Sequence, residues 1–284
     1  LLANRFSDRL LEPLLQVQTL LTGKQEETPL QAPFPEVEPL LSSIQYLVRK
    51  LYHDLDEVTQ TQQVRTDFVA NASHELKSPL TSIKGFAELM ASGLVASEGK
   101  RQEYLQRIVR ESDRLLAIIN DILHLSQAET TPPGPITTVD LQKIAQEVVQ
   151  ALEILAGQRR ITLTVQGKAQ AKANARDVWE MLYNLVDNGI RYGREGGVVR
   201  VMMQEGTQTV TLRVQDNGMG IRQEHLARIF ERFYRVDPSR SRGSGGTGLG
   251  LSIVKHLAGK YQGAVEVESQ PGEGATFTLR FLKA

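Results

Sequence analysis

A short proline-rich segment, Thr130–Pro135, does most to constrain how this chain can fold. Its sequence is TTPPGP, and proline both fixes its backbone φ angle and lacks the N–H that a helix or sheet would use. Before this segment the apolar residues recur at helical spacing, whereas after it helical stretches alternate with short β-type stretches. We therefore predict a helical N-terminal part and a mixed α/β C-terminal part, joined by a linker.

The composition excludes several classes of protein. Lys+Arg 33 and Asp+Glu 33 give a net charge of +0, so no overall field attracts nucleic acid and no nucleic-acid partner is expected. The absence of cysteine excludes a disulfide framework and thiolate metal sites. No run of about 18 apolar residues occurs, so no segment of the sequence itself is expected to span a bilayer.

Two helical patterns flank a connector near the N-terminus. Residues 3–22 have helical apolar spacing, and a near-heptad pattern begins at about Pro39. The connector between them is rich in residues that break helices: Gly23, Pro29, Pro33, Pro35 and Pro39. Helix, connector and helix together resemble a HAMP signal-relay module, which has matching residues at Pro13, Gly23 and Glu36–Val37. A plain helical linker is the alternative.

Two longer helices are predicted between this segment and the proline-rich linker. The first covers residues 60–91 and ends at Ser92–Gly93, and the second runs from Arg101 to about Ala128. The second helix has a stripe at alternating three- and four-residue spacing: Leu105, Ile108, Ser112, Leu115, Ile119, Ile122 and Ser126. One hairpin would leave this stripe exposed, so we expect two chains to form a dimeric four-helix bundle.

The first of these helices carries a candidate nucleophile, His74, beside the carboxylate of Glu75. Imidazole is a neutral nucleophile near pH 7, and a carboxylate that accepts the Nδ1 proton would leave the Nε2 lone pair pointing outward. Pro79 cannot donate to the Glu75 carbonyl, so we expect a local bend. Taken alone, an adjacent His and Glu on a helix are more often a solvated surface pair.

The C-terminal part is predicted to be a two-layer α/β sandwich. Helices are expected at Leu141–Leu155, Val178–Tyr192 and Leu251 to about Lys260. Strands are expected at Ile161–Val165, Val198–Met203, Val210–Val214, Ala264–Glu268 and Ala275–Phe281.

Four pieces of this part could together bind a nucleotide, although neither a Walker motif nor a dinucleotide fingerprint is present. Asn184 and Asn188 share a helix face and offer amide oxygens, which suit Mg²⁺. Asp216–Gly220 (DNGMG) follows a strand, and an arginine-containing segment from Ile229 resembles a lid. Gly246–Gly250 leads into a helix whose free N–H groups attract anions. Each piece alone has an ordinary structural explanation: surface amides, a turn or a loop.

In order, these pieces resemble the N, G1, F and G2 boxes of the sensor histidine kinases, and Phe68–Ile83 resembles the phospho-acceptor box of that family. The resemblance covers residues 60–284. It implies that His74 is autophosphorylated, that Glu75 is the general base, and that Asn188 ligates Mg²⁺ with help from Asn184. Ser78 stands at the position that orients water in phosphatase action, where Thr or Asn is commoner, so phosphatase activity stays open.

The resemblance also implies the nucleotide contacts. Asp216 would recognise adenine, Tyr192 would stack on the base, and Arg191 would reach phosphate. The other residues implied to bind ATP are Gly218, Gly220, Arg232, Arg235, Thr247, Gly248, Leu249 and Gly250. The implied fold is the Bergerat ATP-binding sandwich that this family shares with gyrase, Hsp90 and MutL.

These inferences define a multidomain chain: a HAMP-like segment at 1–58, a dimerisation and phosphotransfer domain at 59–130, and a catalytic ATP-binding domain at 131–284. The expected function is an ATP- and Mg²⁺-dependent histidine kinase that passes phosphate to an aspartate of a response regulator receiver domain. The chain would be the cytoplasmic part of a cell-membrane protein, with its membrane-spanning sensor region upstream. Two alternatives are an ATPase of the same fold without histidine transfer and a non-catalytic pseudokinase scaffold. The first would need a water-activating acid in the asparagine helix, and Tyr183 stands where such an acid could sit, which disfavours it.

Overall fold

The computed structural model describes residues 38–93, 95, 97–130, 134–236, 246–261 and 263–284. The predicted first helix, and all of the predicted connector except its last two residues, lie outside this part. The chain divides into two compact units, Leu1–Ala70 and Asn71–Ala284. None of the helices in the described ranges combines the length and the apolar character that are needed to cross a membrane.

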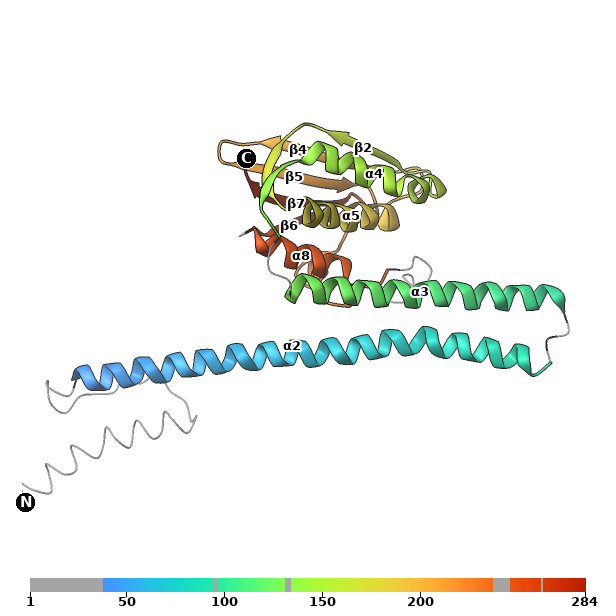
Figure 1. Ribbon diagram of the computed structural model, residues 1–284, viewed down its shortest axis with the longest axis horizontal. Coiled ribbons are helices and arrows are strands. Elements are labelled where there is room, and N and C mark those ends of the chain that lie inside the picture. The colour runs from blue at the N-terminus through green and yellow to red at the C-terminus, as the bar shows by residue number, and fades with distance from the viewer. Residues whose placement is uncertain (1–37, 94, 96, 131–133, 237–245, 262) are drawn as a thin grey trace, which may run out of the picture. The chain divides into compact units, whose positions relative to one another are not determined.

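The described part begins with one long helix, α2, which covers Glu38–Ala91 and contains 54 residues (Figure 1). The helices predicted from about Pro39 and at residues 60–91 are confirmed, but they are parts of this single helix, which continues through Pro79. The helix ends at the turn that includes Gly93, whose φ is +71°. A left-handed φ of this kind carries no steric penalty for glycine.

The second long helix, α3, covers Glu98–Thr130 and forms a hairpin with the last part of α2 (Figure 1). The ring centroids of Phe86 and Tyr104 lie 5.3 Å apart. A salt bridge also joins the two helices, with Arg114 Nη2 3.0 Å from Glu75 Oε2. Part of the predicted stripe on α3 is half-buried in the structure. Leu105 and Ile119 of that stripe stay exposed, and together with three neighbouring residues they form an exposed apolar row on α3: Leu105, Val109, Leu116, Ile119 and Leu123.

The C-terminal part is a two-layer sandwich built on a five-stranded sheet in the order β2-β4-β5-β7-β6. The strands are β2 Thr162–Gln166, β4 Val198–Glu205, β5 Thr209–Asp216, β6 Val265–Gln270 and β7 Gly274–Leu282. Strand β2 is parallel to β4, and the other neighbouring pairs are antiparallel. All five strands occur where the sequence predicts them, because their residues alternate between the core and the outer face of the sheet.

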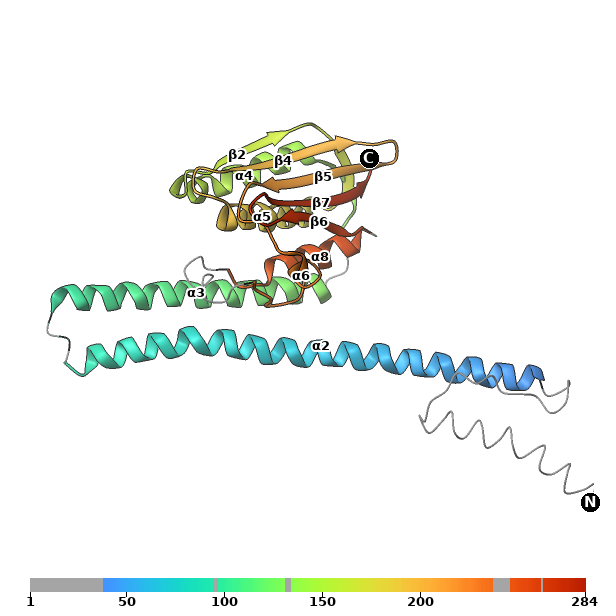
Figure 2. The ribbon, with the colours of Figure 1, turned by 180° about the vertical axis from the view of Figure 1, so that it is seen from behind.

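Three helices cover one face of this sheet, as both views show (Figures 1 and 2). They are α4 Leu141–Gln158, α5 Ala175–Tyr192 and α8 Gly250–Lys260. A short helix, α6 Gln223–Leu226, follows β5 in the sequence. Asp140 and Asn174 cap the N-termini of α4 and α5, because their side chains accept backbone N–H bonds from the first turns. The apolar faces of the three helices and the inner face of the sheet form the core.

A two-stranded sheet was not predicted from the sequence. Strand β1, Thr137–Asp140, pairs antiparallel with β3, Gln170–Ala173, with Thr137 opposite Ala173. Each strand has four residues. Those of β1 are mostly polar, and the alternation of polar and apolar residues in β3 is too short to be recognised as a strand pattern. This small sheet lies at the start of α4 and fixes where that helix begins.

Candidate functional site

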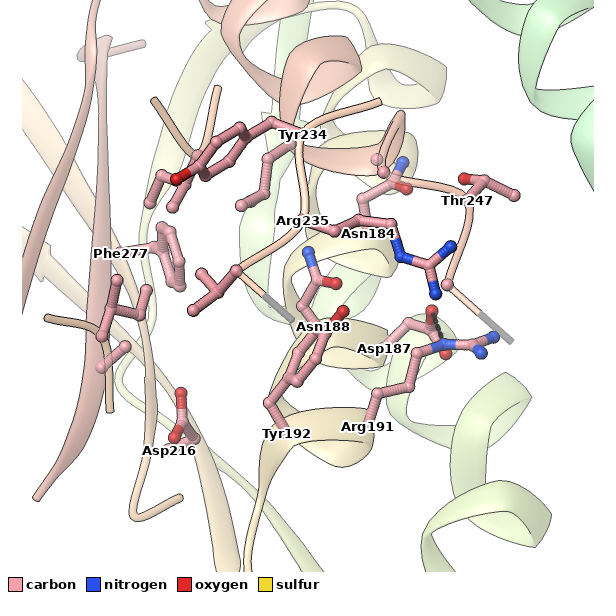
Figure 3. A pocket seen from close by; sticks show the side chains of 18 of the residues that line it. Asn184, Asp187, Asn188, Arg191, Tyr192, Asp216, Tyr234, Arg235, Thr247 and Phe277 are labelled. Atoms are coloured by element: carbon pink, nitrogen blue, oxygen red, sulfur yellow. Dashed lines mark hydrogen bonds and ion pairs between the residues drawn. The ribbon is translucent and has the colours of Figure 1, made fainter. Parts of the chain in front are cut away.

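A cavity of about 860 Å³ opens at one end of the sandwich (Figure 3). Its walls come from α5, from the loop after β5, from residues 229–236, from residues 246–250, from β7 and from α3. The sequence-predicted residues that line it are Asn184, Asn188, Arg191, Tyr192, Asp216, Gly220, Arg235, Thr247, Gly248 and Gly250. The structure therefore brings together residues from all four of the predicted sequence boxes.

One wall of the cavity is a face of α5, from which Asn184, Asp187, Asn188 and Arg191 project (Figure 3). The Asn184 amide nitrogen donates to the Glu180 carbonyl at 2.9 Å, which leaves its amide oxygen toward Gly250. A Cβ at Gly250 would lie 2.7 Å from that oxygen, so glycine permits the close approach. Arg191 Nε donates to Asp187 Oδ2 at 2.5 Å, and the two residues are four apart on the helix.

The end of the cavity beside β5 holds one carboxylate among apolar groups. Asp216 is the last residue of β5, and its Oδ1 accepts the backbone N–H of Gly218 at 2.8 Å. Burial raises the pKa of Asp216 above its ordinary value of 3.8, and the Gly218 N–H partly opposes this shift. Met219, Ile221 and Phe277 also line the cavity. This end is shaped for a flat, mostly apolar group that offers a hydrogen-bond donor to a carboxylate.

Gly220 shows why this loop needs glycine. Its φ is +67°, and a Cβ there would lie 1.9 Å from the carbonyl oxygen of Gln270. A side chain would therefore displace the backbone of the loop between β6 and β7.

The opposite end of the cavity is suited to an anion. Arg191, Arg235 and Thr247 lie there (Figure 3). The α8 helix begins at Gly250, and its N-cap residue Leu249 makes no side-chain cap hydrogen bond, so the N–H groups of the first turn are not capped by it. Free N–H groups and the positive end of the helix dipole attract phosphate oxygens.

The α3 helix reaches this anion-binding end. Thr247 Oγ1 donates to Asp121 Oδ2 at 2.5 Å, and Asp121 itself lines the cavity. Burial raises the pKa of Asp121, and the hydrogen bond from Thr247 partly opposes the shift. A negative group therefore stands at the wall of a site that is otherwise built for anions.

The α5 wall of the cavity offers oxygen atoms that suit Mg²⁺. No group of three or more His, Cys, Asp or Glu side chains that could hold a metal occurs among the described residues. Asn184 and Asn188 line one wall, and between them Asp187 Oδ1 is buried without a hydrogen-bond partner in the described part of the chain. Mg²⁺ prefers oxygen ligands and normally keeps water and phosphate oxygens. These residues therefore fit a Mg²⁺ that enters with a phosphate-bearing ligand.

The candidate nucleophile His74 is exposed on α2, as expected, and Ser78 is exposed one turn later. We expected Glu75 to accept a hydrogen bond from His74, but its Oε2 lies 3.0 Å from Arg114 Nη2 and 3.7 Å from Arg235 Nη1. A guanidinium attracts a carboxylate more strongly than a neutral imidazole does, which explains the difference. Arg235 thus joins the carboxylate beside His74 to the wall of the cavity.

Three predicted binding residues do not line the cavity. Gly218 supports the loop from behind, since a Cβ there would lie 2.3 Å from the Tyr192 carbonyl oxygen. Arg232 pairs with Glu129 of α3, and Leu249 is fully buried. The lining residues that sequence reasoning did not name include Asp121, Arg159, Asp187, Tyr234 and Phe277. Asp187 could have been found, because it lies three residues after Asn184 on the same helix face.

A two-layer sandwich with this cavity, this asparagine helix and this glycine-rich turn defines a class of ATP-binding domain. The family model "Histidine kinase-, DNA gyrase B-, and HSP90-like ATPase" matches residues 173–284, and the model "His Kinase A (phospho-acceptor) domain" matches residues 64–131. The chain belongs to the sensor histidine kinases of two-component systems.

Individual relatives agree with this assignment. The chain is 37% identical over 237 residues to the phosphate regulon sensor protein PhoR of Pseudomonas aeruginosa, covering 82% of this chain and 54% of PhoR. It is 35% identical over 229 residues to the sensor-like histidine kinase SenX3 of Mycolicibacterium smegmatis, covering 80% of this chain and 59% of SenX3. The chain therefore spans little more than half the length of these relatives.

The fold is also found in solved structures. The histidine kinase ThkA, crystallised in complex with the response regulator protein TrrA, superposes with a TM-score of 0.63 at 21% identity. The superposition covers 82% of this chain and 66% of the solved one.

Proposed function

We propose that this protein is an ATP-dependent histidine kinase that phosphorylates its own His74 and passes the phosphoryl group to an aspartate of a response regulator. The observation that carries the proposal is the order of groups in the cavity. A buried carboxylate and apolar side chains lie at one end, and arginines with a helix N-terminus lie at the other. An exposed histidine inside the match to the phospho-acceptor model supplies the second half of the reaction.

ATP would bind along this gradient of polarity. The Asp216 carboxylate would accept the exocyclic amine of adenine, and the ring of Tyr192 would stack on the base. The triphosphate would then extend toward Arg191, Arg235, Thr247 and the N-terminus of α8. Gly248, whose φ is +80°, lets the loop pass close to the backbone of Phe233.

Mg²⁺ would be held by Asn188 with Asn184 and by phosphate oxygens. When bound, the ion would neutralise charge on the phosphates. The amides fit this role because a neutral oxygen ligand does not repel the triphosphate. The adjacent Arg191–Asp187 pair, with its 2.5 Å hydrogen bond, would keep the arginine side chain extended along the same wall.

In the transfer step, the lone pair of His74 Nε2 would form a bond to the γ-phosphorus. The bond between that phosphorus and the bridging oxygen would break, and its electron pair would leave with ADP. Glu75 would act as the base that holds the Nδ1 proton, which requires its carboxylate to turn from Arg114 and Arg235 toward the ring. The two arginines would then stabilise the charge on the transferring group.

The phosphorylated histidine would react with a receiver-domain aspartate. The P–N bond of phosphohistidine is labile, so a carboxylate oxygen can displace the imidazole. The complex of ThkA with a response regulator supports a partner of this kind for the shared fold. Ser78 is exposed one turn after His74, where its hydroxyl could orient a water that attacks the phosphorus of the regulator's aspartyl phosphate and releases the free carboxylate and inorganic phosphate.

We also propose how the whole protein is organised. Residues 59–130 would form the dimerisation and phosphotransfer domain, and residues 131–284 the catalytic domain. Residues 1–58 would form a HAMP-like relay in the cytoplasmic part of a membrane-bound sensor, with the sensor region upstream. The sensor proteins among the relatives and the apolar row left exposed on α3 support this organisation.

The test is labelling with γ-³²P-ATP. The His74→Gln variant should bind ATP like the wild type but lose a label that is labile to acid and stable to alkali. His53→Gln is the matched control, because His53 is an exposed histidine on the same helix. It should keep the full label. A His74→Gln variant that still takes up acid-labile label would place the acceptor elsewhere and overturn the proposal.

A further inference from the structure

The C-terminal end of α5 carries two of the proposed binding residues, Arg191 and Tyr192, and it ends in an unusual way. The last carbonyls of an α-helix have no partner inside the helix. In α4 and α8 the backbone N–H of the C-cap residue, Arg159 or Tyr261, bonds two of these carbonyls. In α5 the C-cap residue is Gly193, which has an extended backbone with φ of −63° and ψ of 160°. That conformation does not turn the backbone N–H back toward the helix.

A side chain from another element takes over this task. Arg159 lies in the turn between α4 and β2, and its guanidinium donates to the carbonyl of Ile190 at 2.5 Å. It also donates to the carbonyl of Arg191, and to that of Gly193 at 3.3 Å. The remaining carbonyl, that of Tyr192, accepts the backbone N–H of Met219 at 3.3 Å. Every carbonyl from residue 190 to residue 193 therefore has a donor.

These bonds tie three parts of the cavity together. Met219 belongs to the loop that carries Asp216, so its bond to Tyr192 fixes that loop to the end of α5. The Arg159 backbone is itself fixed, because its carbonyl accepts the N–H of Gly196 at 3.2 Å and its N–H closes α4. The side chain of Arg159 also lines the cavity. One guanidinium thus connects a rigid turn to the residues around the base-binding end.

The chemistry of the site explains why arginine stands at this position. A guanidinium is a planar fork with several N–H donors, which can meet carbonyls that point in different directions. Its positive charge also lies at the negative end of the α5 dipole. A lysine has the same charge but only a compact ammonium group, so it could reach fewer of the carbonyls at once.

We propose that Arg159 is a positioning residue for nucleotide binding. It holds the end of α5 so that Tyr192 and Arg191 keep their places relative to Asp216. This inference rests on the proposed function, because it needs the cavity to bind ATP. It goes beyond that function by giving a role to a residue that lies outside all four sequence boxes.

The experiment is calorimetric titration of ADP and GDP into the wild-type chain and into Arg159→Met, Arg159→Lys and Arg160→Met, at a temperature well below every unfolding midpoint. Arg160 is the matched control, since it is the next residue but is exposed and pairs only loosely with Glu195, at 3.6 Å. Arg159→Met should raise the Kd for ADP by about tenfold or more with unchanged stoichiometry, because the site is no longer preorganised. Its preference for ADP over GDP should also fall.

Arg159→Lys should lie between the wild type and Arg159→Met, and Arg160→Met should match the wild type. A purely structural role for Arg159 would lower the stoichiometry or the unfolding midpoint and leave the Kd and the base preference unchanged, and this result would overturn the inference. Failure of the wild-type chain to bind ADP would instead overturn the proposed function, so the two failures are distinguishable.

Discussion

Asp216 illustrates how the surroundings of one residue set its chemistry. The carboxyl group is removed from water at the end of β5, and this burial raises its pKa. The N–H of Gly218 holds one oxygen at 2.8 Å and fixes the direction of the group. The carboxylate form is the one proposed to accept a hydrogen bond from the adenine amine, so proton binding and nucleotide binding would compete at this residue.

The affinity for ATP should therefore fall as the pH is lowered through the raised pKa of Asp216, from neutral pH toward the ordinary value of 3.8. The folding stability of the ATP-free protein should depend on pH in the opposite direction. A carboxyl whose folded-state pKa is raised contributes stability that is present below its unfolded pKa and is lost as the pH rises through the folded pKa. Titration calorimetry and urea unfolding across this range measure the two effects.

The matched variant for this prediction is Asp216→Asn. It should bind ATP weakly at every pH and should lose part of the pH dependence of stability. Asp121 and Glu180, whose pKa values are also raised by burial, would keep the rest of that dependence. A variant with the wild-type pH dependence of both affinity and stability would contradict the prediction.

The residues that line the cavity differ in how far the sequence could predict them. Asn184, Asn188, Asp216 and Thr247 belong to motifs whose spacing indicates the chemistry. Arg159 does not, because its role depends on a turn meeting the end of a helix 31 residues later in the chain. Phe277 likewise follows only from the register between β7 and β5, which places it opposite Val214.

At the scale of whole elements, α3 contributes to the wall of the cavity as well as to the hairpin. Its residue Asp121 holds the Thr247 hydroxyl at 2.5 Å, at the end of the cavity proposed to bind the triphosphate. A carboxylate there repels phosphate and occupies a hydroxyl that phosphate could use. In this arrangement the helix would therefore oppose nucleotide binding.

The Asp121→Asn variant should bind ATP about three- to tenfold more tightly than the wild type, because one like charge is removed at short range. Its affinity for adenosine, which lacks phosphates, should not change. Asp113→Asn, on the same helix but exposed, is the control and should leave both affinities unaltered. Equal tightening for ATP and adenosine would show that charge at Asp121 is not the cause.

The long elements were predictable, and the short ones were not. The helices of the hairpin, the three helices of the sandwich and its five strands lie within a few residues of their predicted positions. Strands β1 and β3 and helix α6 have four residues each, which is too short for an apolar period to develop. On α3 the sequence indicated an apolar helix face but not which residues the hairpin itself would cover.

At the scale of the whole molecule, the exposed apolar row on α3 needs a partner. Leu116 is 56% exposed and Leu123 is 51% exposed, and the two residues are seven apart on the helix. Regular apolar spacing of this kind is typical of helices that pack against another helix along their length. A second copy of the chain, as proposed above, would cover this row and complete a four-helix bundle.

Leu116→Glu should therefore raise the dimer dissociation constant by at least about a hundredfold, since each of two copies loses roughly 1.5 kcal/mol of apolar burial. Light scattering during size-exclusion chromatography over a range of concentrations measures this change. The control is Ile154→Glu on α4, because Ile154 is even more exposed, at 78%, but lies in the catalytic part. Disruption of the dimer by the control alone would place the interface there instead.

The unbroken course of α2 has a mechanical consequence. The helix runs without interruption from Glu38 through His74, with a regular ladder of backbone hydrogen bonds along its axis. In the proposed kinase, a stimulus that acts near Glu38 would reach His74 along one continuous helical backbone. Such a stimulus would arrive at the proposed phosphorylation site as a change within this one helix.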